Sequence, residues 1–96
     1  MNFLVAYDVS TQDREGQRRL RRVARACEGY GQRVQYSLFE VVCSRTTMAR
    51  LIAELEIIME AEADAIRIYQ LEADGLDRVI RLGLRRELPN DGPWVL

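Results

Sequence analysis

The stretch RVQYSLFEVVC (residues 33–43) decides the fold of this chain, because its apolar pattern changes phase in the middle. Apolar side chains share one face of an extended segment from Val34 to Leu38, and the opposite face from Phe39 to Cys43. Side chains alternate strictly along a strand, so a bulge or a turn must separate the two halves. The stretch therefore predicts two short strands joined by a tight turn near Ser37 and Leu38.

The residues before this hairpin predict a strand and then a helix. The apolar run at residues 2–7 is typical of a buried strand, and apolar residues at helical spacing predict a helix from about Asp13 to Tyr30. Ser10 or Thr11 is expected to cap this helix, and Asp13 lies three residues after Ser10, as in a capping box.

The residues after the hairpin repeat this pattern in reverse order. Ser44 is a good cap for an amphipathic helix, whose apolar positions are Met48, Leu51, Ile52, Leu55, Ile58 and Met59. Residues 65–71 alternate as a strand, and residues 78–82 predict a fifth.

The predicted order of elements is strand, helix, strand, strand, helix, strand. This α+β order indicates a ferredoxin-like βαββαβ domain over residues 1–82, with an antiparallel sheet, both helices on one face and a short fifth strand. A second copy of the chain is the simplest cover for the other face. The apolar end of the tail, residues 83–96, is expected to dock on that second copy or on another partner.

Composition limits the chemistry that the chain can perform. Its 96 residues, 48% hydrophobic and 30% charged, suit one small domain, and the sequence holds no His and no Lys. These absences exclude Ser-His and Cys-His catalytic pairs, imidazole zinc sites, Walker-type phosphate loops and Schiff bases. Cys27 and Cys43 are far apart in apolar patterns and are expected to be reduced core residues. No apolar run is long enough to cross a membrane, so we expect a cytoplasmic protein.

The net charge is −1, but its distribution along the chain is uneven. On one face of the first predicted helix lie Arg14, Arg18, Arg21, Arg22 and Arg25, whereas residues 54–77 are strongly acidic. Arginine binds phosphate well, because its planar guanidinium donates paired hydrogen bonds and stays charged. The stripe therefore predicts contacts to a nucleic-acid backbone, and a solvated helix face is the alternative.

Asp8 directly follows the first predicted strand. It is either a turn or cap residue or a ligand for Mg²⁺, which takes one or two carboxylates. Two copies of Asp8 across a dimer would make a usable site on the two-fold axis. Glu40 is the other carboxylate in the patterned region and is expected to be an exposed strand residue. The aromatic residues Tyr7, Tyr36 and Phe39 are expected in the core or an interface, with base stacking as the alternative.

Two motifs resemble the CRISPR-associated Cas-two (Cas2) family. Residues 3–10, FLVAYDVS, are similar to its apolar strand with a Tyr-Asp-Ile/Val-Ser signature, and residues 30–40, YGQRVQYSLFE, to its Tyr-Gly-x-Arg-Val-Gln-x-Ser-Val-Phe-Glu segment. Residues 65–69 resemble its fourth strand, and the match extends over about residues 2–82. The tail has no matching motif.

The resemblance implies a homodimer in which the two Asp8 residues share a divalent metal, Mg²⁺ or another cation such as Mn²⁺. It further implies a metal-dependent endonuclease acting on RNA or double-stranded DNA, with Asp8 as the catalytic residue. We expect phosphates to be held by Arg14, Arg18, Arg22 and Arg33. The same family bridges CRISPR integrase subunits during spacer acquisition, so a non-catalytic DNA-binding scaffold is the alternative. A related stand-alone ribonuclease toxin is a third.

Overall fold

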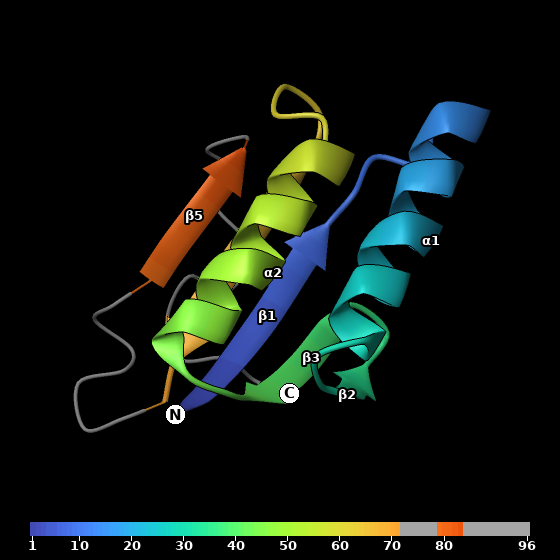
Figure 1. Cartoon of the computed structure of the whole chain (residues 1–96). Helices are drawn as coiled ribbons and strands as arrows, with labels where there is room; N and C mark the ends of the chain where they lie inside the picture. Colours follow the sequence, from blue (N-terminus) through green and yellow to red (C-terminus); the bar gives the residue numbers. More distant parts are fainter. Residues whose placement is uncertain (72–78, 84–96) are drawn as a thin grey trace.

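The computed structural model describes residues 1–71 and 79–83. It contains five strands and two helices in these residues, drawn in Figure 1. In chain order these are β1 (Asn2–Asp8), α1 (Arg14–Glu28), β2 (Gln32–Gln35), β3 (Leu38–Val42), α2 (Arg45–Ile58), β4 (Ala65–Gln70) and β5 (Val79–Gly83).

The strands form one antiparallel sheet in the order β2-β3-β1-β4-β5. The central strand β1 pairs with β3 on one side and β4 on the other, so the two halves of the chain meet along β1. Both helices cover the same face of this sheet (Figure 1). This is the ferredoxin-like α+β arrangement that the order of elements predicted, with β5 added beyond β4.

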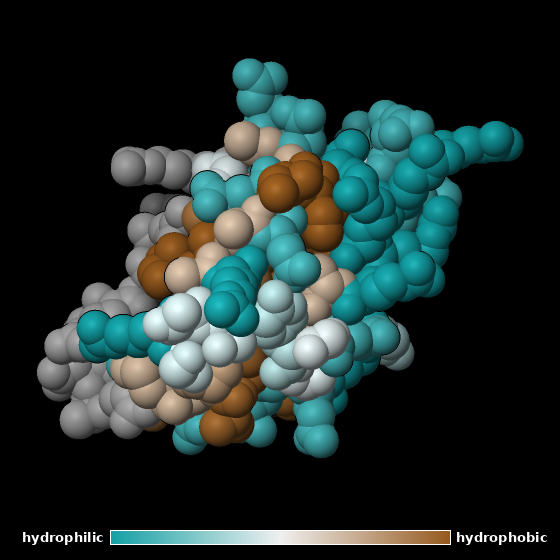
Figure 2. All heavy atoms as spheres, in the orientation of Figure 1, coloured by the Kyte–Doolittle hydropathy of each residue, from teal (hydrophilic) through white to brown (hydrophobic). Residues whose placement is uncertain are grey.

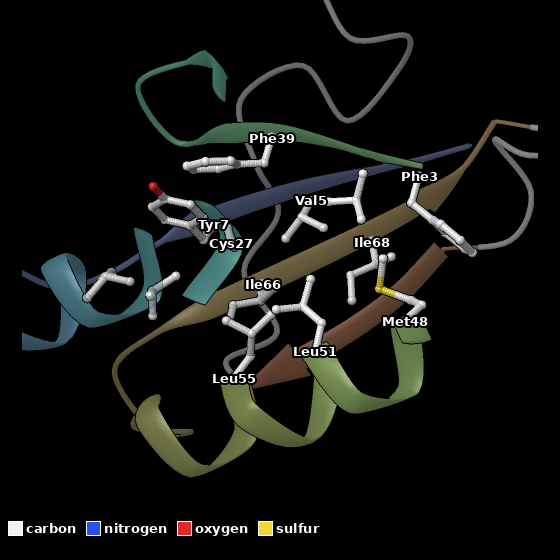
Figure 3. Close-up of a cluster of buried hydrophobic side chains, with 13 residues drawn as sticks. Phe3, Val5, Tyr7, Cys27, Phe39, Met48, Leu51, Leu55, Ile66 and Ile68 are labelled. Atoms are coloured by element: carbon white, nitrogen blue, oxygen red, sulfur yellow. The ribbon is translucent and has the colours of Figure 1, made fainter. Parts of the chain in front are cut away.

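The core lies between the helices and the sheet, as Figure 3 shows. Strand alternation directs every second residue of β1 to this side, so that Phe3, Val5 and Tyr7 are buried. They pack with Phe39 and Val41 of β3, and with the following residues of the other elements: Val23, Cys27, Met48, Leu51, Leu55, Ile66 and Ile68. The apolar positions predicted for α2 are thus buried or packed against this core.

The hairpin confirms the interpretation of the phase change. β2 and β3 are separated by the turn residues Tyr36 and Ser37, one position before the predicted turn. The register also shifts between Arg33 and Gln35, as at a β-bulge. A bulge and a turn together move the apolar residues of β3 onto the core face.

The cap of α1 differs from the prediction. Asp13, not Ser10 or Thr11, is the N-cap residue, and its carboxylate accepts a hydrogen bond from the Gly16 amide at 2.8 Å. Asp13 can do this because its own backbone is extended and its short side chain reaches the third residue of the helix. At α2 the predicted cap is confirmed, since the Ser44 hydroxyl accepts from the Thr47 amide at 3.1 Å.

The opposite face of the sheet carries a second, smaller apolar cluster. Ala6, Leu38 and Tyr69 are buried there, with Leu4 packed against them. These side chains are already covered within one chain, so the dimer expected over this face remains a prediction.

Cys27 and Cys43 are free thiols, and Cys27 is fully buried, as expected of a core cysteine. Within the two described ranges, no helix has the length and apolar character needed to cross a membrane. The expected docking of the tail, including Trp94, concerns residues outside those ranges.

Candidate functional site

Asp8 is the last residue of β1, where the central strand leaves the sheet. Its side chain is half-buried, and strand alternation places it on the same sheet face as Ala6, away from the helices. Its Cα partner on β4 is Ala65. The carboxylate therefore lies at one end of the sheet and not in the helix-covered core.

The β2–β3 turn lies beside Asp8. Ala6 pairs with Leu38, and the next amide, that of Tyr7, donates to the Ser37 carbonyl at 3.0 Å. The turn residues Tyr36 and Ser37 therefore lie next to the end of β1, one residue before Asp8. Glu40 pairs with Leu4, which is four residues before Asp8 on β1, or about 13 Å away at strand spacing. The structure thus brings the β2–β3 turn, and not Glu40, close to the end of β1.

A second carboxylate, Asp64, fixes the loop that follows Asp8. It is fully buried immediately before β4, and its oxygens accept hydrogen bonds from the Ser10 amide at 3.1 Å and the Glu60 amide at 2.9 Å. The Arg19 guanidinium donates to the same group at 2.9 and 3.4 Å. Because these donors satisfy it, Asp64 serves as a structural junction among the β1–α1 loop, α1 and the α2–β4 loop.

The sequence reasoning missed this junction. The available signal was an aspartate just before a strand buried on both sides, Ala65–Gln70, where an ionised side chain needs partners. The ion pair also explains why Arg19 differs from the other arginines of α1. The hydrogen bond to Asp64 raises the pKa of Arg19, so the guanidinium stays charged.

The remaining arginines of α1 make a cationic face, which we define as Arg14, Arg18, Arg21, Arg22 and Arg25. All five are exposed, opposite the buried Val23 and Cys27. Figure 2 shows the hydrophilic side chains gathered over α1 on the right of the view. Eleven helical rises separate its ends, or about 17 Å, enough to follow several phosphates.

The acidic residues nearby leave the cationic face available. Glu15 lies 4.0 Å from Arg18, with both side chains mostly exposed. Such a surface pair contributes little free energy and gives way readily to a phosphate. The predicted phosphate contacts at Arg14, Arg18 and Arg22 thus lie together on one helix.

Arg33 lies apart from the cationic face, on β2. Its guanidinium donates to the Tyr36 carbonyl at 2.7 Å and to Glu28 at 3.3 Å, and lies 5.0 Å from the ring centre of Phe39. These contacts brace the hairpin against the end of α1. The side chain remains 43% exposed, so one side of the guanidinium still faces solvent.

The three candidate aromatic residues have different environments. Tyr7 and Phe39 are buried, with their rings stacked at 6.1 Å between centroids. Burial raises the pKa of Tyr7, whose hydroxyl donates to the Tyr36 carbonyl at 3.3 Å. Tyr36 itself is 92% exposed. The expectation of core positions is therefore confirmed for two of the three.

Arg67 is a further charged residue on the face that carries Asp8. It pairs with Ala6 across β1 and β4, and only 7% of it is exposed. Its guanidinium donates to the Tyr69 hydroxyl at 3.3 Å. The sequence marked it only as one position of an alternating strand, although a basic residue between buried apolar neighbours was a usable signal.

One chain supplies few metal ligands at this end of the sheet. Across residues 1–71 and 79–83, no three His, Cys, Asp or Glu side chains gather as a metal site would require. Asp64 and Asp13 already accept amide or guanidinium hydrogens. Asp8 is half-buried on the sheet face away from the helices. A hard cation that needs one or two carboxylates and otherwise takes water and phosphate fits this arrangement.

Comparisons with known proteins agree with the fold and with these motifs. The family model described as "CRISPR associated protein Cas2" matches residues 1–79. The chain is 45% identical to a CRISPR-associated endoribonuclease Cas2 of Nitratidesulfovibrio vulgaris over 96 residues, covering all of this chain and 94% of the relative. It is 38% identical to a CRISPR-associated endonuclease Cas2 of Halalkalibacterium halodurans, covering 99% of each protein.

A solved structure gives the same result. The crystal structure of Streptococcus pyogenes Cas2 at pH 6.5 superposes with a TM-score of 0.71 at 41% identity, covering 86% of this chain and all of that one. The residues that carry the motifs, β1 with Asp8 and the β2–β3 hairpin, lie inside the matched part. The chain therefore belongs to the CRISPR-associated Cas2 family.

Proposed function

We propose that this protein is a metal-dependent endonuclease of the CRISPR system, acting as a homodimer on RNA or double-stranded DNA. The observation that carries the proposal is the position of Asp8. Its carboxylate ends the central strand beside an exposed turn, within a chain that has no histidine and no lysine for other hydrolytic chemistry. The relatives named as endoribonuclease or endonuclease support the same activity.

Asp8 from each of two copies would hold the cation, Mg²⁺ or Mn²⁺, near the two-fold axis of the dimer. A divalent ion in such a site polarises a phosphodiester and lowers the pKa of a bound water. The Asp64 junction would keep the loop after Asp8 fixed, because it binds the Ser10 amide and the α1 residue Arg19 together.

The cationic face would bind the nucleic-acid backbone without reading its sequence. Arg14 and Arg18 lie in the turns of α1 nearest the β1–α1 loop, and Arg22 and Arg25 extend the surface along the helix. Arg33 would add a contact from the hairpin through the exposed part of its guanidinium. Phosphate contacts of this kind position a substrate and make its binding strongly dependent on salt.

The extent of the cationic face also favours a second function, a DNA-binding scaffold that bridges CRISPR integrase subunits. The face continues over about 17 Å of helix, farther than a single scissile phosphate requires. In this role the arginines of α1 carry DNA and Asp8 contributes to structure.

Cleavage assays distinguish the nuclease from the scaffold. Asp8→Asn keeps the size of the side chain and removes its charge, so a nuclease that uses Asp8 loses Mg²⁺-dependent cleavage of labelled RNA and duplex DNA. The control is an unchanged thermal unfolding midpoint. Cleavage by the folded variant at the wild-type rate would refute the enzymatic role of Asp8.

Charge reversal tests the scaffold. The double variant Arg18→Glu, Arg22→Glu is expected to abolish DNA binding and reconstituted spacer integration, because both residues lie on the cationic face. The matched control is Arg45→Glu, Arg50→Glu, which makes the same charge change at exposed positions of α2. Integration retained by the first pair, or lost equally with the control pair, would contradict this role.

A further inference from the structure

Tyr36 is an exposed aromatic residue at a turn that does not require one. It occupies the first position of the two-residue connection between β2 and β3, and 92% of it is exposed. Short hairpin connections favour Asn, Asp or Gly, because their backbones reach the turn conformation easily. Turn chemistry therefore does not account for a tyrosine here, and neither does core packing.

The backbone under this ring is held firmly. The Tyr36 carbonyl accepts from the Arg33 guanidinium at 2.7 Å and from the Tyr7 hydroxyl at 3.3 Å. The neighbouring Ser37 carbonyl accepts from the Tyr7 amide at 3.0 Å. The turn is thus tied to β1 and β2 through main-chain atoms, which leaves the ring of Tyr36 presented to solvent from a fixed support.

A groove lies directly beside the ring. Its volume is about 540 Å³, and its described lining consists of Arg33, Val34, Gln35 and Tyr36. These side chains offer a guanidinium, an apolar surface, an amide and an aromatic ring. A ring with an adjacent cation and amide suits a flat, polar-edged ligand attached to a phosphate.

The position relative to Asp8 indicates which ligand this is. The β2–β3 turn lies beside the end of β1, because the Ser37 carbonyl accepts from the amide of Tyr7, the residue before Asp8, so a strand with a phosphate at Asp8 passes the turn with its neighbouring nucleotide. In a continuous duplex the bases are stacked inside the helix and cannot reach a protruding side chain. An unpaired base can stack on it.

We propose that Tyr36, beside Arg33 and Gln35, forms a stacking subsite for one unpaired nucleobase next to the phosphate at Asp8. The inference rests on the proposed function, because it assumes that a nucleic-acid strand passes Asp8. It gives the hairpin a role in selecting strands with an unpaired base over uninterrupted duplex. The Arg33 guanidinium positions Tyr36 by donating to the Tyr36 carbonyl. The exposed edge of the same guanidinium faces the adjoining phosphate.

Binding without metal tests the subsite. Fluorescence anisotropy in EDTA measures the affinity for a labelled single strand of about 12 nucleotides and for an abasic deoxyribose-phosphate chain of equal length. Tyr36→Ala should weaken binding of the base-containing strand about tenfold and leave the abasic chain unaffected, because one stacked base is lost. Tyr36→Phe should keep wild-type affinity for both. Ile57→Ala, at an exposed apolar residue of α2, is the matched control and should change neither.

Each other outcome has a definite meaning. Equal binding of the base-containing strand by wild type and Tyr36→Ala, or an equal loss on both oligomers, overturns the subsite. So does a change from dimer to monomer in Tyr36→Ala by light scattering, because the ring would then belong to an interface between copies. If wild type binds both oligomers and only the Tyr36 effect is missing, the proposed nuclease stands. If wild type binds neither, the proposed function fails together with the subsite.

Discussion

Two aspartates at the same end of the sheet have opposite surroundings. Asp8 ends β1 half-buried, on the face away from the helices, whereas Asp64 is fully buried and accepts from two amides and a guanidinium. Burying a carboxylate is costly unless donors satisfy it, so Asp64 commits its oxygens to structure. In the proposed function the metal chemistry is therefore assigned to Asp8 and not to Asp64.

Removing the Asp64 carboxylate should destabilise the fold. Asp64→Ala leaves the Ser10 and Glu60 amides and the Arg19 guanidinium without their acceptor. Breaking a buried ion pair in this way should lower the free energy of unfolding by about 3–5 kcal/mol. Denaturant unfolding measures this change, and Glu62→Ala, at an exposed acid of the same loop, is the control. A loss equal to that of the control would show that the junction does not stabilise the protein.

The contribution of Cys27 to stability is expected to depend on pH in the alkaline range. Burial raises the pKa of its thiol from 9.0 to about 12. Between these values the native state keeps a proton that the unfolded chain releases, so the contribution is complete below pH 9.0 and falls as pH rises toward about 12. We expect Cys27→Ala to be less stable at neutral pH but to lose less stability on going into this window.

Unfolding in denaturant near neutrality and near the middle of this window measures the difference. Tyr7 and Tyr30 also have raised pKa values, Tyr7 mainly through burial and Tyr30 mainly through its hydrogen bond to Glu54. Both remain in the variant, so the comparison isolates Cys27. Parallel loss of stability in the two proteins would contradict the assignment.

At the residue scale, the sequence predicted positions better than partners. Asp8, Cys27 and the arginines of α1 could be placed because each depends on local periodicity. The N-cap was assigned to Ser10 or Thr11, since several capping residues stood in a row and only the path of the loop selects Asp13. The Asp64–Arg19 pair spans 45 positions in the chain, so no local pattern reveals it.

At the scale of elements, the packing of α1 against the β1–α1 loop determines where the arginines of α1 lie. Gly16 is buried in the first turn, and a Cβ there would overlap the Ser10 carbonyl oxygen. A glycine is needed at this position because helix and loop approach so closely. The same contact sets α1 against the loop that follows Asp8.

Gly16→Ala is therefore expected to lower the thermal unfolding midpoint and to weaken nucleic-acid binding by displacing the start of α1. The matched control is Gly29→Ala, because Gly29 has a right-handed helical backbone and a Cβ there makes an ordinary contact at 3.4 Å. That control should be neutral or slightly stabilising through a reduced unfolded-state entropy. If Gly16→Ala also proved neutral, the close approach would not matter to the fold.

The hairpin shows both the power and the limit of pattern reading. The phase change in residues 33–43 correctly predicted a turn, because side-chain alternation is a strict geometric rule, and the structure adds a register shift between Arg33 and Gln35 that was not predicted. The same pattern predicted that Tyr36 lies in the core or an interface, and the core alternative is wrong, because Tyr36 lies in the turn and is exposed. Turn residues leave the alternation, so their exposure depends on where the chain reverses.

At the scale of the whole molecule, the order of elements was sufficient to predict the sheet. Connections between neighbouring elements are short, so βαββαβ leaves few arrangements, and the observed order β2-β3-β1-β4 is the expected one. The dimer follows less directly. Among residues 1–71 and 79–83 no group of three ligating side chains gathers, so the proposed metal site would be complete only when two copies of Asp8 meet.

The salt dependence of binding tests the role of the molecular surface. Each phosphate contact contributes a slope of about −0.9 in log K against log salt on duplex DNA. We expect the slope of the double variant Arg18→Ala, Arg22→Ala to become less negative by the value of about two such contacts, because both residues lie on the cationic face. Titrations at several salt concentrations measure it, and an unchanged slope would place the bound DNA elsewhere.

The central claim is that two Asp8 carboxylates hold one divalent cation. The most direct test is the number of Mn²⁺ ions bound per dimer, measured by titration calorimetry on wild type and Asp8→Asn, with dimerisation checked by light scattering. We predict one ion per wild-type dimer and no such binding by the folded, dimeric variant. Unchanged Mn²⁺ binding in Asp8→Asn, or one independent ion per chain, would contradict it.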